Sequence, residues 1–154
     1  MIDVSRARDA VSAFQRLLDD TPSGVAHVRV APDAWTLAEI VGHMIDSASN
    51  NHQRFARLRQ GDLDPFPAYE AQAWVDAQRH DGCPFATLCA LWTSFNAFLL
   101  RLVETTPEAA LGNVWASPGG PETLEHLVNG YFEHMERHAT HYSGRLAEVL
   151  AERA

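Results

Sequence analysis

Four histidines of this sequence have the spacing of metal ligands. His134, His138 and His141 fall in one stretch near the C-terminal end, and His43 lies far upstream. In a helix that turns about 100° per residue, His134 and His138 lie about 40° apart, and His141 lies about 20° to the other side of His134. The three C-terminal histidines therefore share one face of a helix.

Two histidines at i and i+4 on one helix, joined by a third from a facing helix, can bind zinc, nickel or iron and leave coordination positions open. Such a site lowers the pKa of a bound water or thiol toward neutrality and so creates a nucleophile at pH 7. The alternative is that His43 is a core histidine bonded to a neighbouring helix, while the others face water. The spacing leaves both open, because a metalloprotease requires a Glu directly after the first histidine of the pair, and Met135 stands there.

Two further side chains lie close to this set in sequence. Asp46 follows His43 by three residues and could accept a hydrogen bond that orients its ring. Tyr142 lies about 40° from His138 on the helix, so its phenol could be a weak ligand, a donor to a substrate or a core side chain. Core packing is the favoured interpretation of Tyr142.

Four long segments have the i, i+3, i+4 apolar spacing of amphipathic helices and must position these residues. They span about 4–18, 36–60, 84–104 and 121–152. Thr36 and Glu39 have the spacing of a capping box that starts the second helix, and Gly61 ends it. His43 lies on the inner face of this helix, and the pattern of residues 69–79 predicts a short helix with Trp74 on its apolar side.

The remaining segments are rich in turn residues. Residues 25–30 could be extended but are too few to seed a sheet, and 62–68 and 105–120 are connections rich in Pro or Gly. The sequence therefore predicts an all-α fold: an up-down-type four-helix bundle with one short extra helix in a connection. Its 154 residues, 46% of them hydrophobic, fit a single domain over 1–154.

Composition limits the partners. The formal net charge of −8 argues against nucleic acid, because a phosphate-binding protein needs a clustered basic face. No run reaches the roughly 18 apolar residues of a membrane span, so no membrane partner is expected. Cys83 and Cys89 are six residues apart at the start of a helix, so they point to different faces and form no disulfide framework. This favours a reducing cytoplasm.

Three motifs, taken together, resemble those of the DinB-like (DinB/YfiT) superfamily. They are Trp35-Thr36-x-x-Glu39-x-x-x-His43, then Phe66-Pro67-x-Tyr69-Glu70-x-x-x-Trp74-Val75, then the histidine-rich last helix that ends in Gly144-Arg145-Leu146. The resemblance runs through essentially the whole chain, in order and at plausible spacing.

The resemblance implies a four-helix bundle, often a homodimer, with a divalent metal held by three histidines at one end. One ligand comes from the second helix and matches His43. The other two are typically four residues apart on the last helix, with a Gln three residues after the second. Aligning that Gln with Arg145 places the pair at His138 and Tyr142, so the second ligand would be lost. Either His134 or His141 then replaces it, or the site has no metal.

The resemblance also implies a function. We expect an enzyme that acts on a small molecule, a thiol S-transferase or a hydrolase, in which a Zn, Ni or Fe ion activates a low-molecular-weight thiol co-substrate or water. His43 and His138, with His134 or His141, would hold the ion, and Tyr142 and Arg145 would face the substrate. The alternative from a different class is a metal-free bundle that binds small molecules or serves in a stress response without catalysis.

Overall fold

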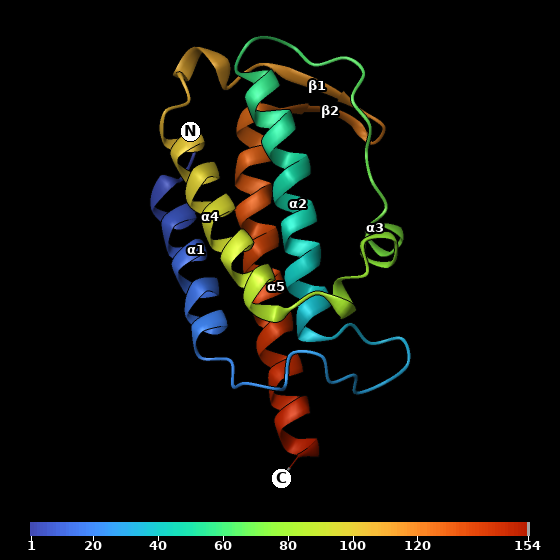
Figure 1. Cartoon of the computed structure of the whole chain (residues 1–154). Helices are drawn as coiled ribbons and strands as arrows, with labels where there is room; N and C mark the ends of the chain where they lie inside the picture. The colour runs from blue at the N-terminus through green and yellow to red at the C-terminus, as the bar shows by residue number, and fades with distance from the viewer. Residues whose placement is uncertain (154) are drawn as a thin grey trace.

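The computed structural model describes residues 1–153, and four long helices dominate it (Figure 1). They are α1 (Val4–Asp19), α2 (Leu37–Leu58), α4 (Phe85–Glu104) and α5 (Leu124–Glu152). A short helix, α3 (Ala71–Gln78), lies in the connection between α2 and α4. The predicted bundle with one short extra helix is therefore confirmed.

The helices do not simply alternate in direction. In Figure 1, α1 and α5 run one way along the bundle, and α2 and α4 run the other way. A long segment after α1 crosses the end of the bundle to reach α2, and the segment that carries α3 returns the chain so that α4 runs parallel to α2. Each of α1 and α2 contacts both α4 and α5, so the apolar faces of all four meet in one core.

Local signals in the sequence set the helix ends. The Thr36 hydroxyl accepts from the Glu39 amide, and the Glu39 carboxylate accepts from the Thr36 amide, which is the predicted capping box. Asp3 and Thr123 cap α1 and α5 in the same way with one side-chain bond each. Pro84 stands just before α4, where its missing amide hydrogen costs nothing.

Three details of the sequence-based prediction were wrong. Residues 25–30 form turns, although Val25 and Ala26 are buried. The connection before α5 contains an antiparallel hairpin of β1 (Val114–Ser117) and β2 (Gly120–Thr123), so α5 begins at Leu124 rather than Pro121. In α3, Val75 is the buried residue, whereas Trp74 is 37% exposed and packs against Tyr69.

A close contact fixes the connection to α2. Arg79 ends α3 with a left-handed backbone (φ 54°), which turns the chain back into the 3-10 turn η1 (His80–Gly82). The ring of His80 then lies directly on Gly42 of α2, where a Cβ atom would overlap it. His80 Nε2 also contacts Asp46 Oδ2 at 3.1 Å, and Gln78 Nε2 donates to Asp46 Oδ1 at 2.6 Å.

The sequence predicted no apolar run long enough to span a membrane, but helix α4 is an exception. By length and composition alone, α4 could cross a membrane, with a mean hydropathy of 1.4 over its most apolar stretch. It is also one of the four packed bundle helices, and Leu88, Trp92 and Leu99 are buried in the core. A single core helix of this kind is weak evidence for a membrane.

The contact between Gly42 and His80 gives a stability prediction. Gly42→Ala forces the His80 ring away from Asp46 and should lower the free energy of unfolding by about 1–3 kcal/mol, the usual cost of overpacking. The control is Gly144→Ala in α5, where a Cβ meets nothing within 4 Å, so helix propensity should raise stability by about 0.5–1 kcal/mol. Urea unfolding measures both, and an unchanged Gly42→Ala protein would contradict the contact.

Candidate metal centre

Three histidines meet between α2 and α5. One ring nitrogen from each of His43, His134 and His138 lies within 4.8 Å of the corresponding atoms of the other two. The Nε2 atoms of His43 and His134 are 3.4 Å apart. The ring of His138 lies 4.7 Å from that of His43 and 4.4 Å from that of His134, measured between centroids. We call these three residues the histidine triad.

Regular helix geometry assembles the triad. His134 and His138 are one helical turn apart on α5, so both rings project from one face. His43 comes from the facing surface of α2, between the buried side chains Ile40 and Met44. Because the two backbones are packed core helices, the rings hold their relative positions without any loop.

The protein does not supply hydrogen-bond partners for all ring nitrogens of the triad. Within residues 1–153, the Nδ1 atoms of all three rings are buried and have no hydrogen-bond partner. Burial lowers the pKa of His43, and it lowers the pKa of His134 to about 4 and of His138 to about 3, with the neighbouring rings adding to the last two shifts. All three imidazoles are therefore neutral at pH 7, which is the form that binds a metal.

The donor set fits a divalent metal. Zinc binds histidine nitrogens at about 2.1 Å, so two ligands of a tetrahedral site lie about 3.4 Å apart. That is the separation of the His43 and His134 Nε2 atoms. A site with three histidines leaves a coordination position for a thiol, water or substrate, as catalytic zinc sites do. Without an ion, the Nε2 atoms of His43 and His134 lie at hydrogen-bond distance from each other, as the alternative of a core histidine bonded to a neighbouring helix requires. That bond still leaves the buried Nδ1 atoms of all three rings without a partner among the described residues.

The remaining predicted site residues lie outside the triad. His141 is exposed, with its ring 5.8 Å from that of His138. The fully buried Tyr142 packs its ring on Phe14 of α1, and its hydroxyl lies 2.7 Å from that of Thr21, just after the end of α1. The resemblance implies two ligands four residues apart on the last helix, and His134 and His138 have this spacing. They lie one helical turn before the pair His138 and Tyr142, at which the alignment of Arg145 with the family's Gln places the ligands.

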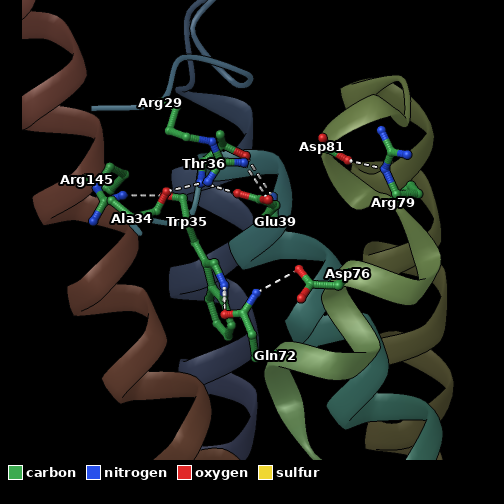
Figure 2. Close-up of polar contacts among 10 residues, drawn as sticks. All are labelled: Arg29, Ala34, Trp35, Thr36, Glu39, Gln72, Asp76, Arg79, Asp81 and Arg145. Carbon is green, nitrogen blue, oxygen red and sulfur yellow. Dashed lines mark hydrogen bonds and ion pairs between the residues drawn. The ribbon is translucent and has the colours of Figure 1, made fainter. Parts of the chain in front are cut away.

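Arg145 and Asp46 also have partners away from the triad. Arg145 donates to the backbone carbonyl of Trp35 (Figure 2), so it fixes the segment before α2, and it also donates to Glu148. Asp46 bonds to His80 and Gln78 rather than orienting the ring of His43. Its negative charge still acts on His43, where it opposes the lowering of the pKa by burial.

Trp35 covers one side of the triad. Its ring lies 5.0 Å from that of His43, and its indole Nε1 donates to Gln72 of α3 at 2.8 Å (Figure 2). Behind it, a hollow of about 510 Å³ is lined by charged residues such as Arg29, Asp76 and Arg79, and none of the triad lines it. Trp35 therefore separates that hollow from His43.

A second cavity reaches the triad itself. It has a volume of about 310 Å³, lies between α2 and α5 and includes His134 in its wall. The buried Arg54 also lines it and was not singled out from the sequence. One signal was available, since Arg54 follows His43 by three turns of the same helix. This cavity offers a small molecule a route to His134.

A family profile described as the DinB superfamily matches residues 6–141, a range that contains the whole triad. The chain belongs to the DinB superfamily. The predicted membership is confirmed on a match over most of the chain. None of the curated proteins matches this sequence.

Two solved structures of this fold are similar to the chain. YfiT from Bacillus subtilis, described as a probable metal-dependent hydrolase with an unusual four-helix bundle topology, aligns with a TM-score of 0.81 and 17% identity over 96% of this chain and 85% of its own. The mycothiol-dependent maleylpyruvate isomerase aligns with a TM-score of 0.75 and 17% identity over 89% of this chain. The chain spans only 57% of the isomerase, and at these identities the likeness shows the shared fold.

The lowered histidine pKa values predict a pH-dependent stability for the metal-free protein. Below pH 6.5 these imidazoles are protonated in the unfolded chain. In the folded chain they stay neutral down to a pH of about 4 at His134 and about 3 at His138. The unfolded state then binds more protons, so the free energy of unfolding must fall as the pH falls. Urea unfolding between pH 7 and 5, with chelator present, measures the slope.

The matched variant for this experiment carries His134→Gln and His138→Gln. Glutamine keeps a polar side chain but cannot titrate, so the variant should lose less stability than the wild type over the same pH range. Equal slopes in the two proteins would show that the triad histidines do not carry depressed pKa values.

Proposed function

We propose that this chain is a metal-dependent enzyme that acts on a small molecule, with His43, His134 and His138 as the ligands of a divalent zinc, nickel or iron ion. The observation that carries the proposal is the triad: three neutral imidazoles, one buried and two half-buried, with one nitrogen each inside a span of 4.8 Å. The two similar structures support it, since one is described as probably metal-dependent and the other as dependent on a thiol.

The nucleophile in this proposal is a low-molecular-weight thiol or water, for thiol S-transfer or hydrolysis. A divalent ion at the triad supplies the Lewis acidity that lowers the pKa of a thiol or water to near neutrality. The thiol comes from a separate molecule, because neither Cys83 nor Cys89 lines the cavity at His134. Burial also raises the pKa of Cys89 to about 11, which makes it a poor nucleophile.

The protein residues position and enclose the site. His43 comes from α2, and His134 and His138 come from α5, so all three ligands lie on rigid helices. Trp35 excludes water from one side of His43, and Arg145 holds the Trp35 backbone in place. In this arrangement Arg145 is a positioning residue, and Tyr142 supports α5 through its bond to Thr21.

The setting of the protein is part of the proposal. We expect a homodimer in the cytoplasm that binds no nucleic acid. Large apolar side chains exposed on α4, Leu91 at 49% and Phe98 at 53%, support a protein partner for that helix. The free thiols of Cys83 and Cys89 agree with a reducing compartment.

Metal analysis tests the ligand set. Protein purified without a histidine tag should contain about one equivalent of a divalent metal per chain, or take it up on addition of Zn, Ni or Fe. His43→Ala, His134→Ala and His138→Ala should each reduce this below about a tenth of an equivalent, because two imidazoles rarely hold such an ion in water. The matched control is His141→Ala, next to the triad on the same helix, which should keep the metal.

Loss of metal in His141→Ala with retention in His134→Ala would overturn the ligand assignment. A wild-type protein that holds no metal and takes none up would overturn the metal-dependent function itself. That second result would favour the metal-free binding protein.

Chelation tests the chemistry. Turnover of an electrophile such as 1-chloro-2,4-dinitrobenzene with a small thiol should fall at least 100-fold after chelator treatment and return on addition of metal. The His141→Ala protein should respond as the wild type does. Equal turnover with and without chelator would contradict the proposed mechanism.

A further inference from the structure

Arg54 of α2 is a buried arginine without a carboxylate partner. Only 7% of its surface is exposed, and it forms no ion pair in the part of the chain that the structure describes. Its Nε atom is buried with no hydrogen-bond partner among residues 1–153. Burying a guanidinium costs free energy unless an anion or acceptors replace the lost water.

The contacts that Arg54 does make orient its guanidinium. Its plane lies over the ring of Trp115 in β1, 4.3 Å from the centroid. One terminal nitrogen donates weakly to the carbonyl oxygen of Pro67 at 3.4 Å. These contacts use one face of the guanidinium and one of its terminal nitrogens. A guanidinium has five N–H donors in a planar fork, so most of its donors remain available.

Arg54 lies in the wall of the 310 Å³ cavity. Arg54 is the one arginine that lines it, and the other lining residues come from α2, α5, β2 and the segment before α3. They include Ser47, Asn51, Tyr69, Glu122, His126 and His134. The cavity is at the small end of the range for ligand sites, so it suits a small molecule.

The cavity connects Arg54 to the histidine triad. On α2, His43, Ser47, Asn51 and Arg54 follow one another at steps of three or four residues, which places them along one face. His43 and Arg54 are separated by about 16 Å of helix rise. His134 belongs to both the triad and the cavity wall.

The charges around the cavity favour a carboxylate. An arginine fork binds a carboxylate through two parallel hydrogen bonds, and one positive charge matches one negative charge. A doubly charged phosphate would meet the nearby carboxylate of Glu122 with only this one arginine to neutralise it. We propose that Arg54 binds the carboxylate of an elongated small-molecule substrate whose other end reaches the triad at His134. This inference rests on the proposed function.

The experiment uses hexanoate as the probe and metal-free, chelator-treated protein, so that the probe cannot bind through a metal. Ligand-observed NMR should show hexanoate binding to the wild type, while neutral hexanamide of the same shape does not bind. Arg54→Gln should weaken hexanoate binding at least ten-fold, and Arg54→Lys should weaken it less, because it keeps the charge but loses the fork.

The matched control is Arg57→Gln. Arg57 lies three residues further along α2 and is exposed, so its loss should leave hexanoate binding unchanged. The melting temperature of each variant shows whether it is folded. Arg54→Lys keeps the inference testable if Arg54→Gln does not fold.

Several outcomes would overturn the inference. They are a wild type that does not bind hexanoate, an Arg54→Gln protein that binds it equally well, equal loss in Arg57→Gln, or tighter binding of inorganic phosphate than of hexanoate. Zinc titration of the wild type and Arg54→Gln is read in parallel. Zinc bound without hexanoate removes this inference alone. Hexanoate bound by a protein that takes up none of Zn, Ni and Fe removes the proposed metal function and leaves Arg54 as a carboxylate site.

Discussion

The packing of α2 against α5 brings three imidazole rings together, tilted or edge-on to one another, and the rest of the site depends on this contact. Each buried ring nitrogen without a partner costs about 1–3 kcal/mol relative to one that is hydrogen-bonded. The apolar residues beside the rings, such as Ile40, Met44 and Met135, are fully buried and stabilise the same helix pair. The fold therefore carries a local cost at the triad, which is typical of a functional site.

Helix α2 carries the polar groups that connect the triad to its surroundings. His43 faces α5, whereas Asp46 faces η1 and contacts His80, so the buried polar groups of this helix point in two directions. The second contact depends on Gly42, because only a residue without a Cβ lets the His80 ring lie on the helix backbone. The connection between α2 and α4 is held close to the triad by this pair.

Much of the bundle could be predicted from the sequence, because its signals are local. Apolar spacing marked the four long helices, and the Thr36 and Glu39 capping box fixed the start of α2. The hairpin of β1 and β2 could not be predicted, since each strand has four residues and is held by pairing and by the bond of Leu63 to Val114 across the chain. Trp74 could not be placed because an eight-residue helix has no clear apolar face.

The site could be predicted in part for the same reason. Helix spacing put His134, His138 and His141 on one face, but it could not choose among them, because the choice depends on the rotation of α5 against α2. The structure brings His134 to His43 and leaves His141 exposed. The partner of Asp46 was also beyond local spacing, since His80 reaches it through the left-handed turn at Arg79.

Because α2 and α5 run in opposite directions, the groove between them has two different ends (Figure 1). At the triad end, the three histidines come from helices, and Trp35 of the segment before α2 covers them. The Arg54 end is closed by β1, which supplies Trp115, and by the segment that contains Pro67 and Tyr69. Connections tolerate sequence change far better than packed helices do. Under the proposed function, residues on the two helices set the chemistry at His43 and His134, while the connections around Arg54 can change substrate preference without disturbing it.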